Sequence, residues 1–214
     1  MGNPKSYRGS ELTWEKGRQL KSYGTNSYKY DENGIRISKT VNGTEHKYTL
    51  NGSNVVCEEY GTTKLDYLYD IGNSVCGMRV NNGTTYYFRK NLQGDITAIT
   101  DNEGNIIAKY RYDAWGKVLS TTGNTEIANL NPFRYRGYYY DAETQLYYLN
   151  SRYYDPETCR FINADDVSVL KGFSNINECN LYANVGNNPV NDGEVFGYIA
   201  VKARLTIFTK IIKF

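Results

Sequence analysis

Short runs of alternating apolar and polar residues recur along most of the chain. Residues 35–39 and 106–112 are typical, since roughly every second side chain in them is apolar. This period-2 alternation predicts β-strands with one buried and one solvent-facing side. Asn-Gly is the preferred pair of a type I′ hairpin turn, because both central residues need positive φ. Such pairs stand between the runs at 33–34, 42–43, 51–52 and 82–83. The pattern predicts a series of β-hairpins.

A repeat of about 20 residues begins at Tyr28, and self-similarity at this period is typical of stacked supersecondary units. Its signature, Tyr-x-Tyr-Asp, occurs at 28–31, 67–70 and 110–113, and weaker copies start at Tyr48 and Tyr87. Tyrosines two apart face the same side of a strand. We therefore expect rings of neighbouring hairpins to stack in ladders and the aspartate to bind backbone amides in the turn. The alternative is that exposed rings bind sugars.

Residues 131–166 are dense in tyrosine and are broken at short intervals by Gly, Pro and Asp. Aromatic runs with this punctuation predict a β-meander. Four arginines, Arg134, Arg136, Arg152 and Arg160, stand among these rings. A guanidinium stacks on a ring face or reaches a carboxylate, which makes the stretch a candidate site as well as a folding unit.

The same stretch resembles the RHS repeat-associated core, which closes the shell of RHS (YD-repeat) proteins. The family pattern is close to NPF-Y-G-YYD-ET-LYYL-RYYDP-GRF-D and precedes a variable C-terminal region. Gln145 and Cys159 stand where the family usually has glycine, which predicts looser turns there. The resemblance implies an all-β fold in which hairpins line up side by side as a curling ribbon, part of a hollow cocoon closed by the core.

The resemblance also divides the chain into segments. We expect a partial upstream repeat at 1–27, YD repeats at 28–130, the RHS core at 131–166, a shell-closing boundary at 167–193 and a short variable tail at 194–214.

Residues 180–193 resemble the boundary that ends the shell, with the usual Asp-Pro-x-Gly shortened to Asp192-Gly193. In large family members this region resembles an aspartate autoprotease that releases the C-terminal part. The resemblance places its catalytic residues at Arg152, Asp165 and Asp192. Two carboxylates held close share a proton, which leaves one as base toward water and one as acid. The alternative is that Asp165 caps a turn and forms a structural ion pair with Arg152 or Arg160.

The resemblance implies a structural function, as a shell segment of a bacterial polymorphic toxin that encloses and presents a C-terminal effector. The expected partners are that effector segment and an upstream YD-repeat shell, in a larger secreted or cell-surface protein. A carbohydrate-binding adhesion module and the autoprotease are the alternatives. The first residues lack the apolar run of a secretory signal, so we expect an export address elsewhere.

Composition narrows the classes further. With 22% charged and 40% hydrophobic residues, the 214-residue chain is globular. A net charge of +2 with scattered Lys and Arg argues against nucleic-acid binding. The lone His46 and the absence of a Cys-x-x-Cys pair argue against a metal site, and we expect no cofactor. Four cysteines, Cys57, Cys76, Cys159 and Cys179, allow three disulfide pairings, and buried free thiols are the favoured alternative.

The end of the chain, 197–214, is too short and too charged to span a bilayer. Its apolar residues alternate as in a strand and also fit one helical face. Eighteen residues cannot bury a core, so we expect the remnant or the beginning of an effector.

Overall fold

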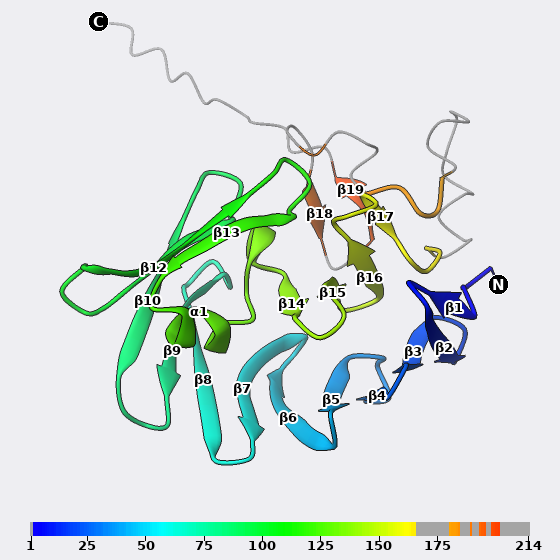
Figure 1. The fold of residues 1–214 in the computed structure, drawn as a ribbon, viewed down its shortest axis with the longest axis horizontal. Coiled ribbons are helices and arrows are strands. Elements are labelled where there is room, and N and C mark those ends of the chain that lie inside the picture. The colour runs from blue at the N-terminus through cyan, green and yellow to red at the C-terminus, as the bar shows by residue number, and fades with distance from the viewer. Residues whose placement is uncertain (1, 166–179, 185–188, 190–192, 196–197, 202–214) are drawn as a thin grey trace, which may run out of the picture.

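The computed structural model describes residues 2–165, 180–184, 189, 193–195 and 198–201. Almost all of this is antiparallel β-structure (Figure 1). Thirteen strands form one sheet in chain order, so each strand pairs with its neighbours in the sequence. We call this sheet the wall. Its strands are β1 (Ser6–Tyr7), β2 (Ser10–Glu15), β3 (Gln19–Tyr23), β4 (Asn26–Tyr30), β5 (Arg36–Val41), β6 (Thr44–Asn51), β7 (Asn54–Tyr60), β8 (Thr63–Tyr69), β9 (Val75–Val80), β10 (Thr85–Lys90), β11 (Ile96–Thr100), β12 (Ile106–Tyr112) and β13 (Val118–Gly123). The expected all-β ribbon of side-by-side hairpins is confirmed.

The rest of the described chain forms smaller units. After the wall come a short helix and a 3-10 turn, then a four-stranded meander and a two-stranded hairpin. These elements are α1 (Thr125–Leu130), η1 (Tyr135–Gly137), β14 (Tyr139–Asp141), β15 (Leu146–Leu149), β16 (Arg152–Asp155), β17 (Arg160–Phe161), β18 (Gly193–Val195) and β19 (Tyr198–Val201). We call residues 131–165 the core segment. The β-meander predicted there is confirmed, whereas the five-segment division of the chain stays a prediction.

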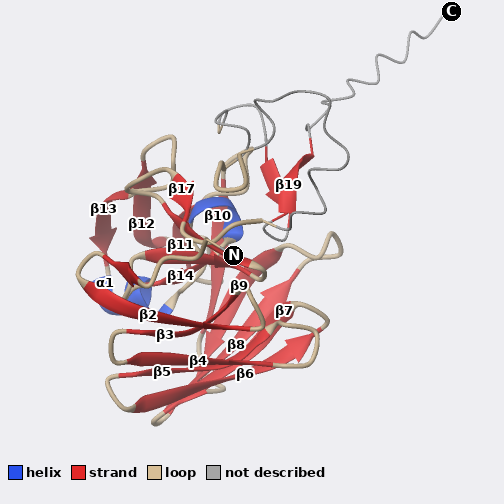
Figure 2. Ribbon diagram, turned by 90° about the vertical axis from the view of Figure 1, so that its right-hand side faces the viewer, coloured by secondary structure: helices blue, strands red, loops and turns tan. Residues whose placement is uncertain are grey.

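The wall curves around the core segment. Figure 1 shows β2 to β13 as an arc with β14, β15 and β16 inside it, and Figure 2 shows β2 to β8 side by side. On β12 the buried residues Ala108 and Tyr110 alternate with the exposed Lys109 and Arg111, as the period-2 pattern predicted. The inward side chains of the wall form one hydrophobic cluster with residues of the core segment such as Tyr148. This ribbon is therefore filled by its own core segment.

Only one of the four Asn-Gly pairs forms the predicted type I′ turn. Asn42 and Gly43 both have positive φ (50° and 80°) between paired Val41 and Thr44, as a type I′ turn requires. The other three Asn-Gly pairs do not form this turn. Gly52 occupies the first loop position, Gly34 closes a longer loop, and at 81–83 positive φ falls on the two asparagines. The register of the flanking strands, rather than the Asn-Gly pair alone, selects the turn.

The aspartate of each Tyr-x-Tyr-Asp motif organises a longer loop. Its Oδ1 accepts a hydrogen bond from the amide four residues later in all three copies, with distances of 2.8–2.9 Å for Asp31, Asp70 and Asp113. The predicted binding of turn amides by this aspartate is confirmed. These hydrogen bonds explain why an aspartate follows the strand in each copy of the motif, because the loop amides have no strand partner.

In the described strands of the wall, the tyrosine rings do not stack in ladders from hairpin to hairpin. The first tyrosine of a motif points inward and meets the core segment instead. The centroid distances are 5.9 Å for Tyr28–Tyr153, 5.7 Å for Tyr48–Tyr139 and 4.9 Å for Tyr67–Phe133. The ladder prediction was wrong because the interior of the ribbon is occupied, so inward rings find partners there.

The second tyrosine of each motif joins its hairpin to an earlier part of the wall. Its hydroxyl donates to a backbone carbonyl at 2.8–2.9 Å, in the pairs Tyr30–Leu20, Tyr69–Val55 and Tyr112–Ile96. Both tyrosines are therefore architectural, one toward the core segment and one along the wall.

Two turns of the core segment lack the usual glycine but keep its conformation. Gln145 and Cys159 have φ of 59° and 60°, in the left-handed region that glycine adopts without strain. The Gln145 amide still donates to the Asp141 carbonyl at 2.8 Å. The expectation of a looser turn at Gln145 was therefore wrong.

The cysteines differ from the favoured alternative in one respect. Cys57, Cys76 and Cys159 are free thiols, as expected, but each is partly rather than fully buried. Cys57 and Cys76 lie on wall strands β7 and β9, and Cys159 lies in the turn before β17. Cys179 lies outside the described residues.

Part of the expected tail is described. Residues Tyr198–Val201 form strand β19. The alternating residues after Val201 lie outside the described part, so the choice between strand and helix there stays a prediction. Among the described residues, no helix has the length and apolar character needed to cross a membrane.

Candidate functional site

Two of the three predicted site residues meet in the interior. Arg152 Nη2 lies 3.2 Å from Asp165 Oδ2, and each side chain is only 1% exposed. Buried charges are retained in proteins when they are paired, so this contact accounts for both groups. Asp192, the third predicted residue, lies outside the described residues.

The core meander brings these two residues together. Arg152 begins β16, and after β17 the chain returns along β16, where the Ile162 amide donates to the Tyr153 carbonyl at 2.8 Å. The Tyr153 amide in turn donates to Asn163 Oδ1 at 2.9 Å. These bonds return Asp165 to the start of β16. The Arg152 guanidinium also lies 3.6 Å from the centroid of the Phe161 ring.

The boundary segment 180–184 lies against this pair. The Leu181 carbonyl accepts hydrogen bonds from the Asp165 amide (3.0 Å) and from Arg152 Nη1 (3.2 Å). Next to it, the Phe161 amide donates to the Tyr182 carbonyl at 3.0 Å. The boundary segment thus extends the core meander beyond β17, and its backbone touches both predicted site residues.

The wall adds a contact that the sequence did not predict. Arg18, from the turn between β2 and β3, places Nη1 3.9 Å from Asp165 Oδ1. Asn163 Nδ2 donates to the Arg18 carbonyl at 3.4 Å. No sequence signal could have found this pair, because its two residues belong to opposite ends of the described chain and to different units.

A second charged cluster, around Asp141, fastens the core segment to the middle of the wall. Asp141 accepts hydrogen bonds from Arg36 Nη1 (2.6 Å), Arg36 Nη2 (2.9 Å) and Lys39 Nζ (3.0 Å), while Lys39 also pairs with Glu143. Burial opposes ionisation of Asp141, but Arg36 and Lys39 outweigh it and hold the pKa of its carboxyl below the usual range. Burial, and then the charge of Asp141, raise the pKa of Glu143.

Tyrosine rings surround the Arg36 guanidinium. Its carbon lies 4.2–6.0 Å from five ring centroids, those of Tyr28, Tyr48, Tyr139, Tyr148 and Tyr153. Ring faces attract a cation, and Arg36 is only 1% exposed. The rings therefore replace part of the water that this guanidinium loses on burial.

Glu58 forms a third buried contact between wall and core segment. It accepts hydrogen bonds from the hydroxyls of Tyr67 (2.7 Å) and Tyr139 (2.8 Å), and His46 Nδ1 lies 2.7 Å away. Burial opposes its ionisation, but the bond to His46 and the charge of Lys39 lower its pKa. His46, on β6, is itself partly buried beside Glu58.

Ion pairs also join two turns of the wall, at Arg8 and Lys117, to the end of β16 and the turn that follows it. Arg8 Nη2 lies 2.6 Å from Asp155 Oδ1, and Lys117 Nζ lies 2.7 Å from Glu157 Oε2. The hydroxyl of Tyr7 donates to Asp155 as well. Around Asp141, Asp155 and Glu157, the wall supplies the cation and the core segment supplies the carboxylate. Asp165 has one cation from each, Arg18 from the wall and Arg152 from the core segment.

The predicted aromatic surroundings hold for three of the four core arginines. Guanidinium-to-centroid distances are 4.1 Å for Arg134 over Tyr110, 5.3 Å for Arg136 over Tyr135 and 3.6 Å for Arg152 over Phe161. Arg160 is exposed.

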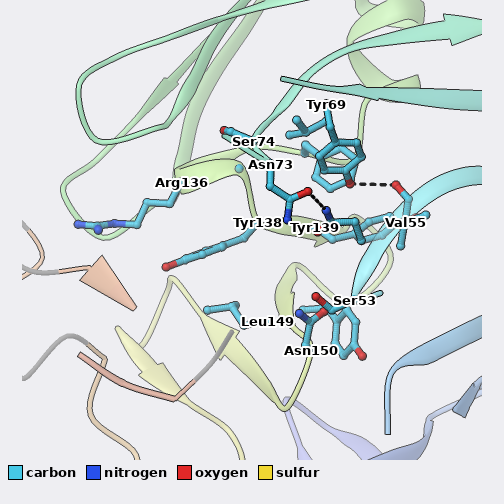
Figure 3. A pocket seen from close by; sticks show the side chains of 15 residues that line it. Ser53, Val55, Tyr69, Asn73, Ser74, Arg136, Tyr138, Tyr139, Leu149 and Asn150 are labelled. Atoms are coloured by element: carbon cyan, nitrogen blue, oxygen red, sulfur yellow. Dashed lines mark hydrogen bonds between the residues drawn. The ribbon is translucent and has the colours of Figure 1, made fainter. Parts of the chain in front are cut away.

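A pocket of about 250 Å³ lies between the wall loops and the core segment (Figure 3). Rings such as Tyr69 and Tyr139 line it together with the amides of Asn54 and Asn73, which bind each other at 2.6 Å. None of its described lining residues is a carboxylate, histidine or cysteine, so the pocket offers no acid–base pair. This pocket is therefore no alternative to the Arg152–Asp165 pair as a site of acid–base chemistry.

Comparison with known proteins places the chain among shell-forming repeats. The family model of the teneurin YD-shell matches residues 56–190. The chain is 42% identical over 169 residues to the tRNA3(Ser)-specific nuclease WapA of Bacillus spizizenii, an alignment that covers 77% of this chain and 7% of that protein. It is 41% identical over 167 residues to the tRNA nuclease WapA of Bacillus subtilis, with the same coverage of 77% and 7%.

A solved structure shows the same fold. The crystal structure of TcdB2-TccC3 superposes with a TM-score of 0.71 at 22% sequence identity, covering 92% of this chain and 11% of that chain. The chain thus spans about a tenth or less of each of these relatives.

Proposed function

The chain belongs to the teneurin YD-shell family, and from this premise we propose that it serves as a structural shell segment of a bacterial RHS/YD-repeat polymorphic toxin. In this role it encloses and presents a C-terminal effector segment within a larger secreted or cell-surface protein. Its partners are that effector segment and the upstream part of the shell.

The observation that carries this proposal is the way the wall is fastened to the core segment. The buried ion pairs of Arg36 and Lys39 with Asp141 join strands β5 and β14, which are distant in the sequence, and Arg18 of the wall lies 3.9 Å from the buried Asp165. Breaking such a pair strongly destabilises a fold, because it leaves an uncompensated buried charge. A wall fastened in this way keeps its curvature, which an enclosing shell requires.

Protease protection tests the enclosing role. A cleavage site for a specific protease is placed directly after Val201 in the longest natural protein that contains this chain. We expect the parent protein to be protected from the protease. The Asp141→Asn variant should be cut at the inserted site, because the substitution loosens the wall. Glu45→Gln is the matched control, because Glu45 pairs with Lys29 on the exposed side of the wall. Equal cleavage of all three proteins would refute enclosure.

Self-cleavage is a second candidate function, favoured by the contact of Arg152 and Asp165 with the boundary segment. In this role Asp165 accepts a proton from water while Asp192 supplies one to the leaving amine, and Arg152 holds Asp165 in place. The chain should cut itself shortly after the boundary and release a basic peptide about as long as the 197–214 tail.

Intact mass spectrometry tests the cleavage. Asp165→Asn keeps the shape of the side chain and removes the titrating group, so it should abolish processing completely. A full-length mass for the folded parent chain would refute self-cleavage and leave the shell function in place.

A further inference from the structure

Two arginines of the core segment bind backbone carbonyls of the expected boundary, residues 167–193. Arg152 Nη1 donates to the Leu181 carbonyl at 3.2 Å, and Arg136 Nη2 donates to the Pro189 carbonyl. Pro189 is itself buried. A hydrogen bond from a charged donor is stronger than one between neutral groups, so each contact is a firm hold on the chain. The boundary is therefore held at two separate points.

Arg136 has an unfavourable backbone conformation. Its φ of 53° and ψ of 20° lie in the left-handed region, which is costly for a residue with a Cβ. Such a conformation persists only where the surroundings over-determine it, and it is found most often at functional positions. Figure 3 shows the Arg136 side chain pointing away from Tyr69 and Tyr139 of the pocket. The strained residue thus directs its guanidinium out of the pocket, where Pro189 accepts its hydrogen bond.

A loop of the wall holds Arg136 in this conformation. The Arg136 amide donates to Asp95 Oδ1 at 2.9 Å, and Asp95, only 5% exposed, ends the loop between β10 and β11. Asn91, at the start of the same loop, donates from Nδ2 to Asp95 Oδ2 at 2.6 Å. The Ile96 amide then donates to the Arg134 carbonyl at 3.1 Å. The position of the Arg136 guanidinium therefore depends on the wall.

The hairpin of β18 and β19 follows the Pro189 contact. In this hairpin Gly193 pairs with Val201, and the hairpin begins only a few residues after Pro189. A short tether restricts the movement of a segment more than a long one does. The bond from Arg136 to Pro189 therefore limits how far the hairpin can move from the core segment.

We propose that Arg136 is a retaining residue that couples the wall to the place where the C-terminal part leaves the shell, an inference that rests on the proposed shell function. While the loop 91–95 holds the Arg136 backbone, the guanidinium keeps Pro189 against the core segment. When the wall opens at β10 and β11, Arg136 loses Asp95, its left-handed conformation relaxes, and the hold on Pro189 is lost. An intact wall thus retains the effector-bearing end, and an opened wall releases it.

Hydrogen exchange of the whole chain tests the hold on Pro189. Arg136→Leu removes the donor, and the amides of β18 and β19 should exchange about tenfold to a hundredfold faster, as loss of a hydrogen bond from a charged group predicts. Arg136→Gly should do the same while relieving the left-handed strain, so it keeps the test valid if Arg136→Leu folds poorly. Arg136→Lys, which keeps the charge and a donor, should recover part of the protection.

Arg160→Leu is the matched control, because Arg160 is an exposed arginine of the same core segment. It should leave the exchange of β18 and β19 unchanged. The Phe161 amide, which is bound to the Tyr182 carbonyl at 3.0 Å, should stay protected in every Arg136 variant, because it belongs to the other point of attachment. Equal exchange of β18 and β19 in Arg136→Leu, Arg136→Gly and Arg160→Leu would overturn the inference.

Asp95→Ala tests the coupling to the wall. The hairpin should lose protection as it does in Arg136→Leu, although the Arg136 side chain is intact. If β18 and β19 keep their protection in Asp95→Ala, the wall does not control the hold on Pro189, and the coupling is refuted. The protease site after Val201 tests enclosure separately. Equal cleavage there in the parent protein, Asp141→Asn and Glu45→Gln would refute the shell function, whereas hairpin exchange alone decides whether Arg136 retains Pro189.

Discussion

Replacing Asp141 by asparagine removes the charge that Arg36 and Lys39 share, at nearly constant shape. The carboxylate is fully buried and accepts three hydrogen bonds from these two cations. Breaking a buried pair in this way costs about 3–5 kcal/mol, because the remaining charge has lost its partner. The tyrosine rings around Arg36 offset up to about 2 kcal/mol of this loss. We therefore expect a net loss of about 3 kcal/mol, from a total of about 5–15 kcal/mol that is typical of a domain.

Urea unfolding, followed by intrinsic fluorescence at neutral pH, measures this loss. Glu45→Gln should leave the midpoint unchanged, since its partner Lys29 is exposed. The double variant Arg36→Met/Asp141→Leu should recover most of the stability, because apolar side chains often replace a buried ion pair without loss. A loss of unfolding free energy below about 1 kcal/mol for Asp141→Asn would show that this pair contributes no more than an exposed ion pair does, and would refute its role as a buried fastening.

The pH dependence supplies a second check on Asp141. Its folded-state pKa is lowered, so the charged carboxylate stabilises the fold above the unfolded pKa of about 3.9. This contribution is lost as the pH falls through the lowered pKa, and the parent chain should then approach Asp141→Asn in stability. Glu143 has a raised pKa and acts in the opposite sense, because its protonation favours the folded state. If the difference in unfolding free energy between the parent chain and Asp141→Asn stayed constant down to acid unfolding, Asp141 would not have the lowered pKa.

Other features can be tested one at a time. Tyr69→Phe should lower stability by about 1 kcal/mol through loss of the bond to the Val55 carbonyl, and Tyr69→Ala by a few kcal/mol, both measured by urea unfolding. Saturable binding on a glycan array, abolished in folded Tyr69→Ala, would instead favour the carbohydrate alternative. Gln145→Gly and Cys159→Gly should each stabilise the chain by up to about 1 kcal/mol by relieving left-handed strain, and unchanged melting temperatures would contradict this. Gly77→Ala should lower the melting temperature, since its Cβ would lie 2.6 Å from a backbone oxygen of β10, and a parental melting temperature would show that the two strands can separate there.

Local sequence patterns predicted local structure well. Alternation and the Tyr-x-Tyr-Asp repeat located the hairpins, and the punctuation of the core segment located its meander, because these signals act between residues that are neighbours in the chain. Turn type was less predictable. Asn33 and Gly34 belong to a loop organised by Asp31, so the carboxylate and the strand register decided the geometry.

The candidate site was predictable only as far as the family resemblance reached. The resemblance selected Arg152 and Asp165, which the structure brings into contact. Nothing in the sequence pointed to Arg18 or to the pairing of Arg36 with Asp141, because these contacts depend on how far the wall curls. The prediction that tyrosine rings stack in ladders was wrong for the same reason. Alternation shows that one face of a strand is buried, but it does not show what covers that face.

The fastening of the wall by the core segment has a consequence for the order of synthesis. Arg8 and Tyr7 bind Asp155, which lies 147 and 148 residues further along the chain. At translation rates of about 5–20 residues per second, the first hairpin waits about 7–30 s for this partner. During that time the inward tyrosines of the growing ribbon have no core segment to cover them. Until Asp155 is made, this exposed apolar surface is where we expect the nascent chain to aggregate.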